Sequence, residues 1–328
     1  MQTILVIGSN SFSGATFADF CLQKGAHVIG TSRSDEPIDP FLPYKWNDHT
    51  NFAFYPYDLN KHLQIIKELL HDVKPEYVVN FAAQSMVGES WNNPGDWFMT
   101  NAVSTIKLHD ELRKCDFLKR YLHVSTPEVY GSCSGFVQED CSFNPSTPYA
   151  VSRAATDMSL NTFHSAYNFP VVTTRAANVY GPGQQLYRII PRTILFILLG
   201  RKLQLHGGGV STRSFIHMRD VCDATYKIMI NGKNGQTYHI STSSVVSIHA
   251  LVESICIKLK VKFEDSVEFV GERLGKDSAY HLDSTKVRTE LGWNDHIALD
   301  HGLDECIDWV KKNFEILKAQ PYDYQHKT

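Results

Sequence analysis

Short apolar runs alternate with stretches of helical periodicity through the first half of the chain. The first run, Thr3–Ile7, is a buried-strand pattern that ends at Gly8. The next stretch, 15–24, has helical spacing and stops at Gly25, a residue suited to a helix end. The alternation continues with strand-like runs at 27–31, 52–57, 77–81, 121–125 and 170–175, and with helical patterns at 61–73, 97–112 and 148–167. Strands separated by single helices predict an α/β protein with a doubly wound parallel sheet.

After Arg175 this regular pattern loosens. Turn signals cluster at 181–183, which reads Gly-Pro-Gly, and at 207–209, which is Gly-Gly-Gly. We expect a smaller C-terminal α/β substrate-binding lobe there, because open parallel sheets bind ligands beyond the carboxyl ends of their strands. The predicted division is a first domain at 1–175, to which part of 213–242 returns, a lobe mainly at 176–320, and a tail at 321–328. The polar tail is expected to be ordered only by docking.

Composition narrows the classes of partner and ligand. The net charge is -3, without a long run of one sign, so we expect no nucleic-acid partner. The seven cysteines are dispersed and include no Cys-x-x-Cys pair, which predicts reduced thiols in a cytoplasmic protein and no metal site. The longest apolar run, 189–199, contains Pro191 and Arg192 and is too short to cross a membrane, so no membrane partner is expected.

A glycine-containing turn, Gly8-Ser-Asn-Ser-Phe-Ser-Gly14, follows the first predicted strand. Glycines at such a turn let backbone amides approach a pyrophosphate at the N-terminus of the next helix. This context indicates a Rossmann-type domain that binds a nicotinamide dinucleotide. Ser11 stands where the middle glycine is usual, and a purely structural turn remains the alternative.

The end of the second predicted strand, 31–34, bears on the choice between NAD and NADP. An acid usually holds the adenosine ribose hydroxyls of NAD at this place, whereas an arginine can pair with the 2′-phosphate of NADP. Arg33 therefore favours NADP slightly, while Asp35 or Glu36 could still serve NAD.

Two further motifs carry candidate catalytic chemistry. Tyr149 and Arg153 lie four residues apart near the start of a predicted helix and so share a face. A fixed cation can lower the pKa of a tyrosine from about 10, so that the phenol can serve as a base. The segment 125–131, Ser-Thr-Pro-Glu-Val-Tyr-Gly, presents Thr126 and Glu128 directly after a strand. Thr126 can bond a substrate hydroxyl, and Glu128 can move a proton.

In this order and spacing, the motifs resemble those of the extended short-chain dehydrogenase/reductase family, the NAD-dependent epimerases and dehydratases. Further matching segments are Asn80-Phe-Ala-Ala-Gln-Ser85, Asn178-Val-Tyr-Gly-Pro182, Arg213-Ser-Phe-Ile-His217 with Asp220, and Leu291-Gly-Trp293. The resemblance extends from Ile4 to about Val310. Within the family the chain looks most like the sugar-nucleotide 4,6-dehydratases that act on dTDP-glucose or GDP-mannose, which implies an NAD(P)-dependent lyase.

The resemblance also implies a reaction sequence. Tyr149 accepts the proton of the sugar O4 while a hydride leaves C4 for the nicotinamide, and Thr126 bonds the same oxygen. Glu128 removes the C5 proton, water leaves from C6, and the hydride returns to C6, giving a 4-keto-6-deoxy sugar nucleotide. Arg153 takes the place of the family's lysine beside the cofactor.

Binding residues follow from the same resemblance. The implied cofactor-binding residues are Gly8, Ser11, Phe12, Gly14, Arg33, Asp58, Leu59, Ala82, Tyr149 and Arg153. The implied substrate-binding residues are Ser85, Asn178, Arg188, Arg192, Arg213 and Arg273. Family members commonly form homodimers through two helices of each subunit, here the predicted helices at 97–112 and 148–167.

Two departures from the family pattern leave alternatives open. Arg153 is a planar fork in place of a compact ammonium. Pro127 stands where the dTDP-glucose enzymes have an aspartate, which leaves both proton transfers to Glu128. A C4 epimerase or C4 dehydrogenase, which needs Tyr149 and Thr126 but not Glu128, is one alternative. A non-catalytic dinucleotide-binding sensor or scaffold is the other.

Overall fold

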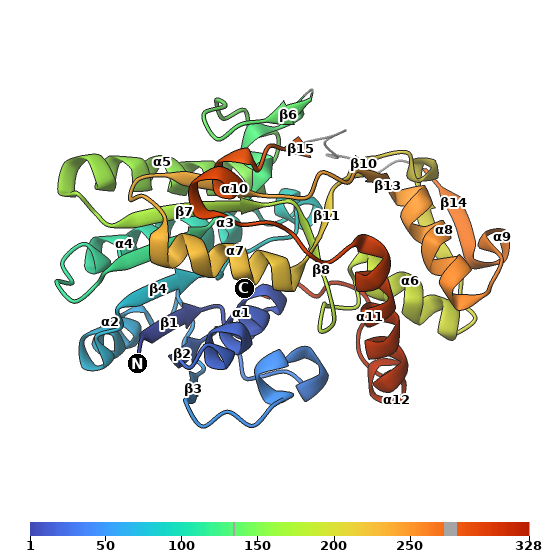
Figure 1. Cartoon of the computed structure of the whole chain (residues 1–328), viewed down its shortest axis with the longest axis horizontal. Coiled ribbons are helices and arrows are strands. Elements are labelled where there is room, and N and C mark those ends of the chain that lie inside the picture. The colour runs from blue at the N-terminus through green and yellow to red at the C-terminus, as the bar shows by residue number, and fades with distance from the viewer. Residues whose placement is uncertain (134, 272–280, 328) are drawn as a thin grey trace.

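The computed structural model describes residues 1–133, 135–271 and 281–327. A central sheet of seven parallel strands has the spatial order β12-β7-β5-β4-β1-β2-β3 (Figure 1). Its strands are β1 Thr3–Ile7, β2 His27–Thr31, β3 Phe52–Tyr55, β4 Tyr77–Asn80, β5 Arg120–Val124, β7 Val171–Ala176 and β12 Thr237–Ile240. From the β3 edge inward, the strand order is β3-β2-β1-β4-β5. This is the order of a doubly wound Rossmann-type sheet, so the predicted fold class is confirmed.

Both faces of the sheet are covered, which explains why its strands are almost continuously apolar. Along β1, Ile4 and Val6 belong to one core with helices α1 and α7, while Leu5 and Ile7 belong to a second core with α2, α4 and α5. The covering helices are α1 Phe12–Gln23, α2 Leu63–Val73, α4 Thr105–Leu112, α5 Pro148–Tyr167 and α7 Met218–Asn231. The sheet order reverses between β1 and β4, and a crevice at that point is where such sheets bind ligands.

The predicted helix at 97–112 is instead three joined pieces. Helix α3, Pro94–Phe98, leads into a six-residue π-helical segment, Met99–Ser104, and then into α4. Within the π segment, Asn101 bonds the backbone of Gln84 through its side chain and accepts a hydrogen bond from Thr156 through its carbonyl. Helical spacing in a sequence does not reveal such a bulge, because tertiary contacts hold it.

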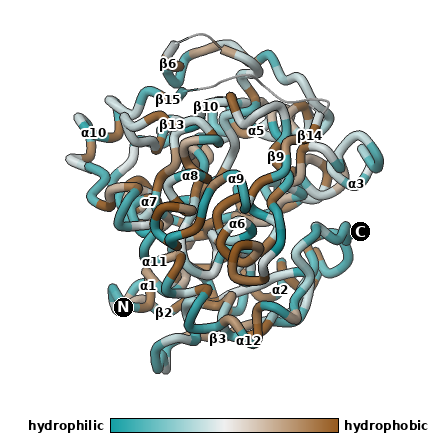
Figure 2. The backbone as a smooth tube through the Cα atoms, turned by 90° about the vertical axis from the view of Figure 1, so that its right-hand side faces the viewer, coloured by the Kyte–Doolittle hydropathy of each residue, from teal (hydrophilic) through white to brown (hydrophobic). Residues whose placement is uncertain are grey.

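A smaller lobe lies beside the C-terminal ends of the sheet strands (Figure 1). Its third hydrophobic core unites α6 with α8 and α11, and Figure 2 shows α6 as a predominantly hydrophobic helix. The elements here are β8 Asn178–Tyr180, α6 Ile189–Leu198, β9 Leu203–His206, β10 Thr212–Arg213, β11 Phe215–His217, β13 Val246–Ser247, α8 Ile248–Leu259, α9 Phe263–Ser266, β14 Val267–Val270, α11 Leu299–Lys312 and α12 Phe314–Leu317.

Short pairings connect the two parts. Strand β8 pairs in parallel with β11, and α7 follows β11 directly, so the chain returns to the first sheet. The remaining elements are β6 Phe136–Val137, β15 His281–Leu282 and α10 Thr285–Leu291, with 3₁₀ turns at Asp39–Phe41, Pro43–Lys45, Gly88–Trp91, Pro127–Tyr130 and Gly207–Gly209. In the described part of the chain, no helix has the length and apolar character needed to span a membrane.

Candidate active site

A cleft of about 800 Å³ separates the carboxyl ends of the central strands from the smaller lobe. Its size falls in the range of small-molecule sites. Twelve predicted site residues line it: Ser11, Phe12, Arg33, Ser85, Thr126, Glu128, Tyr149, Arg153, Asn178, Arg188, Arg192 and Arg213. The structure therefore gathers residues from most of the sequence motifs into one place.

The first glycine turn has the shape that a dinucleotide site requires. A Cβ atom on Gly14 would lie 2.1 Å from the carbonyl oxygen of Gly8, and one on Gly8 would lie 2.7 Å from the amide nitrogen of Ala82. Ser11 caps α1: its Oγ accepts from the Gly14 amide at 3.1 Å and donates to the Gly8 carbonyl at 2.7 Å. The serine thus stabilises the turn without adding bulk that would close it, and the turn fits a pyrophosphate at the start of α1.

The adenosine side of the cleft differs from the expectation for NADP. The Arg33 guanidinium is exposed, and its Nη1 donates to the backbone carbonyl of Lys327 at 2.8 Å. Glu36 is held by Tyr44 and Lys45, at 2.9 and 2.7 Å. In this arrangement Arg33 holds the tail through Nη1, and the Glu36 carboxylate is engaged by Tyr44 and Lys45 rather than free for the ribose hydroxyls.

Asp58, Leu59 and Ala82 lie outside the residues that line the cleft. Asp58 and Leu59 are buried, and the Asp58 carboxylate accepts from the amides of Asn60 and Lys61 at 2.6 and 3.2 Å. These bonds are those of a turn-forming aspartate. A cofactor contact at these three residues stays a prediction.

Tyr149 lies in the first turn of α5, which begins with two local signals. Thr147 caps the helix by accepting from the Ala150 amide at 3.1 Å, and Pro148 occupies the first helical position, where a missing N–H costs nothing. These two residues hold the adjacent phenol in the cleft wall. The Tyr149 side chain is only 7% exposed.

The 3₁₀ turn after β5 supplies the neighbours of Tyr149. Thr126 caps this turn, with its Oγ1 accepting from the Glu128 amide at 3.3 Å, and it also hydrogen-bonds Tyr149. Pro127 is buried at the first position of the turn, where a proline fits without loss of a hydrogen bond. Pro127 therefore has a structural role in the turn that carries Thr126 and Glu128.

The protonation of Tyr149 depends on opposing effects. Burial raises its pKa above 10, and the charge of Glu128 raises it further. The Arg153 cation, the hydrogen bond with Thr126 and the more distant Arg188 cation lower it. The chain's own groups therefore leave the phenol protonated, and a further positive charge in the cleft would be needed to make it a base near neutral pH.

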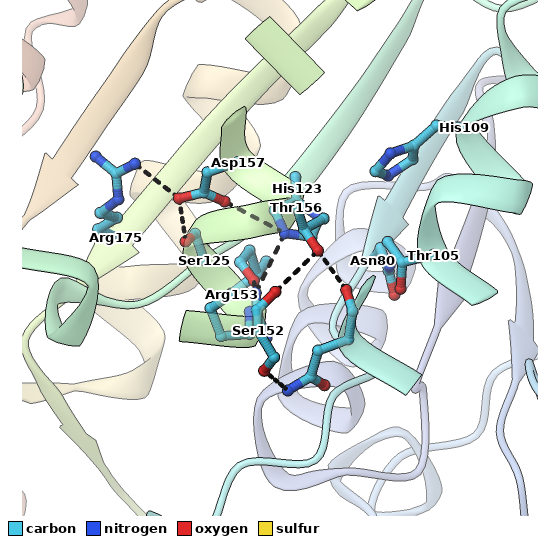
Figure 3. A network of polar contacts seen from close by, with 12 residues as sticks. Asn80, Thr105, His109, His123, Ser125, Ser152, Arg153, Thr156, Asp157 and Arg175 are labelled. Carbon is cyan, nitrogen blue, oxygen red and sulfur yellow. Dashed lines mark hydrogen bonds and ion pairs between the residues drawn. The ribbon is translucent and has the colours of Figure 1, made fainter. Parts of the chain in front are cut away.

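Arg153 lines the cleft although it is only 4% exposed, and Figure 3 shows it among its polar neighbours. Its Nη2 donates to the carbonyl of Val124 and lies 3.3 Å from Nε2 of His123. Its Nε is buried without a hydrogen-bond partner among the described residues. A buried donor in this state is costly unless a ligand satisfies it, so Arg153 fits a bound group with hydroxyl oxygens, such as a cofactor ribose.

Behind Arg153 a buried polar network crosses three elements (Figure 3). Asp157 on α5 bonds Arg175 of β7 at 2.7 Å and Ser125 at 2.6 Å. His123 of β5 lies 3.6 Å from Asp157 and 3.1 Å from the Tyr121 hydroxyl. The sequence motifs did not point to this network, because its members come from separate segments.

The predicted substrate arginines lie at the other end of the cleft. Arg188 occupies the N-cap position of α6 with an extended backbone. Its guanidinium carbon lies 5.4 Å from the centroid of the Tyr187 ring. Arg192 pairs with Asp323 at 3.0 Å, and Nη1 of Arg213 donates to the carbonyl of Thr212 at 2.8 Å. Asn178 begins β8, and Ser85 is exposed in the cleft. Arg273 lies outside the described residues.

The C-terminal tail docks across the cleft. Tyr322 packs against Phe196, with ring centroids 5.3 Å apart, and Tyr324 lines the cleft beside Tyr187. The His326 ring stacks on Trp97 at 5.0 Å, and the Lys327 carbonyl accepts from Gln84 at 2.7 Å as well as from Arg33. Sequence reasoning missed Tyr324, Tyr187 and Gln84; the aromatic density of 322–326 was the available signal.

Similar proteins share both this sheet and this sequence pattern. A family model described as GDP-mannose 4,6 dehydratase matches residues 5–306. A dTDP-glucose 4,6-dehydratase of Xanthomonas campestris pv. campestris is 30% identical over 333 residues, which cover 95% of this chain and 94% of that protein.

Solved structures give the same result. The dTDP-glucose 4,6-dehydratase of Bacillus anthracis in complex with NAD has a TM-score of 0.87 at 28% identity, covering 96% of this chain and 98% of that one. The corresponding enzyme of Streptomyces venezuelae, also with NAD, has a TM-score of 0.88 at 28% identity, with the same coverage of 96% and 98%. A UDP-glucose 4-epimerase of Thermotoga maritima has a TM-score of 0.85 at 25% identity, covering 95% and 100%.

A Rossmann-type sheet whose cleft gathers a tyrosine, a threonine and a glutamate defines a nicotinamide-dependent enzyme of the epimerase/dehydratase class. More particularly, the chain belongs to the GDP-mannose 4,6 dehydratase family. The prediction of a nicotinamide-dependent sugar-nucleotide 4,6-dehydratase is thereby confirmed.

Proposed function

We propose that this protein converts a dTDP-hexose into its 4-keto-6-deoxy form, with Tyr149, Thr126 and Glu128 as the catalytic residues. The observation that carries the proposal is the meeting of these three side chains on one wall of the cleft, with Thr126 bonded to Tyr149. The 30% identity to dTDP-glucose 4,6-dehydratases over 95% of the chain supports thymidine as the base.

The residues divide the chemistry between them. Tyr149 takes the proton from the sugar O4, and Thr126 holds that oxygen. Glu128 then takes the C5 proton, which the new C4 ketone makes acidic, and delivers a proton to the C6 hydroxyl as it leaves as water. A nicotinamide bound there would supply the hydride acceptor for C4 and the hydride donor for C6, and its positive charge would lower the Tyr149 pKa that burial raises.

NAD is the cofactor we propose for this chain. The Arg33 guanidinium bonds the Lys327 carbonyl, and similar solved dehydratases contain NAD. The slight preference for NADP predicted from Arg33 alone is therefore withdrawn. Gly8, Ser11, Phe12 and Gly14 remain as the proposed pyrophosphate turn, and Arg153 as the proposed partner of the nicotinamide ribose.

A panel of sugar nucleotides tests the substrate and the reaction together. The purified protein would be incubated with glucose and mannose linked to dTDP, UDP or GDP, in heavy water, and the products followed by mass spectrometry. Loss of one water with deuterium at C5 is the expected result for the dTDP-hexose. Conversion of every active substrate without loss of water would replace the proposal with the C4 epimerase or dehydrogenase alternative.

The same proposal includes a homodimer in the cytoplasm. Exposed apolar side chains gather on the predicted dimer helices: Phe98, Met99 and Val103 near α3 and the π segment, and Val151 and Met158 on α5. Met158 is 59% exposed, and α3 and α5 contact one another. Such a patch on neighbouring helices fits an isologous interface. Light scattering of the parent and of Met158→Glu would test it, with a dimer expected for the parent and dissociation for the variant.

A further inference from the structure

The arrangement behind Arg153 contains a residue whose role the family pattern does not assign. His123 of β5 is 2% exposed, and its Nε2 lies 3.3 Å from Nη2 of Arg153. The Arg153 side chain carries only N–H donors, so a hydrogen bond to it requires an acceptor. The 3.3 Å contact from Nη2 therefore needs an unprotonated Nε2 on His123.

The neighbours of His123 can accommodate that tautomer. A neutral ring with a free Nε2 carries its proton on Nδ1, and Nδ1 lies 3.1 Å from the Tyr121 hydroxyl. That hydroxyl can in turn donate to Nε2 of His109 at 3.0 Å. With this tautomer, the buried chain of hydrogen bonds donates in one direction, from Arg153 through His123 and Tyr121 to His109.

Charges around His123 keep its ring neutral. Burial lowers the pKa of His123 far below 6.5, and the Arg153 and Arg175 cations lower it further. Oδ1 of Asp157 lies 3.6 Å from Nε2 of His123, beyond hydrogen-bond distance, and the other carboxylate oxygen, Oδ2, accepts from Arg175 and Ser125. The titratable groups that face His123 are therefore two arginines, the Asp157 carboxylate, Tyr121 and His109, and burial lowers the pKa of His109 as well.

We infer that His123 is a positioning residue for Arg153. Its imidazole and the Val124 carbonyl both accept from Nη2 of Arg153. These two contacts fix the guanidinium so that Nε stays in the cleft wall as a donor for the cofactor. The inference rests on the proposed function, in which Arg153 faces the nicotinamide ribose. A guanidinium is a rigid planar fork, so fixing one nitrogen orients the others. A lysine ammonium can rotate its donors freely, so it needs no acceptor behind it to orient them.

This contrast gives a specific test. His123→Leu removes the acceptor at similar volume, and His123→Gln keeps an acceptor. Both substitutions would be made in the parent and in the Arg153→Lys background. For each variant, NAD affinity would be measured by fluorescence titration, and kcat, KM and the pH profile of kcat would be determined. Melting curves and circular dichroism would establish that each variant is folded.

In the parent, His123→Leu is expected to weaken NAD binding about ten-fold, the scale of one hydrogen bond to a charged group, and to move the acid limb of the kcat profile to higher pH. His123→Gln should recover most of the affinity. In the Arg153→Lys background, His123→Leu should change the affinity less than about two-fold. Equal losses in both backgrounds, or no loss in the parent, would overturn the inference.

A measurement on the parent protein keeps the inference testable if His123→Leu does not fold. In ¹⁵N-histidine-labelled protein, with the signal assigned by its absence in His123→Gln, the ring should be neutral with the proton on Nδ1. A proton on Nε2 would overturn the inference, because a protonated Nε2 cannot accept a hydrogen bond from Arg153. Failure of the proposed function is a separate outcome: a parent that binds NAD but dehydrates no sugar nucleotide refutes the activity, while the affinity cycle still decides the role of His123.

Discussion

The two ends of the cleft are built in different ways. At the nicotinamide end, Thr126, Tyr149 and Arg153 are at most 7% exposed and rest on β5 and α5, elements of the regular sheet and its covering helices. At the nucleotide end, Arg192 pairs with Asp323, whose side chain is 71% exposed, and on the adenosine side of the cleft Arg33 bonds another carbonyl of the same tail. One end is a packed interior, and the other is a surface closed by a tail.

This difference determines how substitutions should behave. A buried polar group that loses its hydrogen-bond partner is left desolvated and unsatisfied. Substitutions at the nicotinamide end are therefore expected to reduce activity strongly. Exposed ion pairs contribute little and are screened by salt, so single changes at the nucleotide end are expected to be mild. The following predictions test this contrast in order of expected effect.

Tyr149→Phe should have the largest effect, because it removes the group that starts the reaction. We expect kcat to fall by about 10³ to 10⁴, with no reduced cofactor detected by absorbance when substrate is added. NAD affinity should change little. Reduced cofactor forming at the parental rate in this variant would assign the base to another residue.

Glu128→Gln should separate oxidation from dehydration. The substitution is nearly isosteric, so binding should survive, while loss of water slows by about 10² to 10³. Reduced cofactor and a 4-keto sugar should then accumulate on the enzyme, and deuterium should enter C5 more slowly. Dehydration at the parental rate would refute the role of Glu128 and sharpen the case for a different proton acceptor.

Arg153→Ala should lower both turnover and NAD affinity by about ten-fold or more. The Arg153 cation lowers the Tyr149 pKa, so its removal raises that pKa, and the acid limb of kcat should move to higher pH. Arg153→Lys keeps the charge and should preserve or increase activity. An unchanged pH profile in Arg153→Ala would mean that this arginine does not act on Tyr149.

Arg213→Ala and Arg192→Ala form a matched pair at the nucleotide end. Removal of Arg213 should raise the substrate KM by about ten-fold with little change in kcat, because it removes a charge-assisted contact to a phosphate. Arg192 already pairs with an exposed aspartate, so its loss should raise KM only about two- to three-fold, and less at high salt. A larger effect at Arg192 would reverse the assignment.

Arg33→Ala should have the smallest effect. If its guanidinium serves mainly to hold the tail, the preference for NAD over NADP should stay within about two-fold of that of the parent, while the tail becomes easier to cleave by protease. A marked loss of NADP affinity in this variant would restore the 2′-phosphate assignment made from the sequence.

Much of the site was predictable because it follows elements with strong local signals. Gly8 and Gly14 mark a turn in which neither position has room for a Cβ atom, and Thr147 and Pro148 mark the helix start that carries Tyr149. The π segment at 99–104 was not predictable, because it is held by bonds from distant residues. The tail contacts of Tyr324 and Lys327 were missed for the same reason.

The order of strands, helices and motifs along this chain determined its fold class, its cofactor class and the residues that we propose for catalysis. These properties depend on short-range rules: periodicity, helix capping and the steric demands of tight turns. The tertiary structure alone decided the partners of each charge, since Arg33 meets Lys327 and Arg153 meets His123 across 294 and 30 residues of sequence. Hydrogen bonds and burial act through space, and only the folded chain brings those groups within reach of one another.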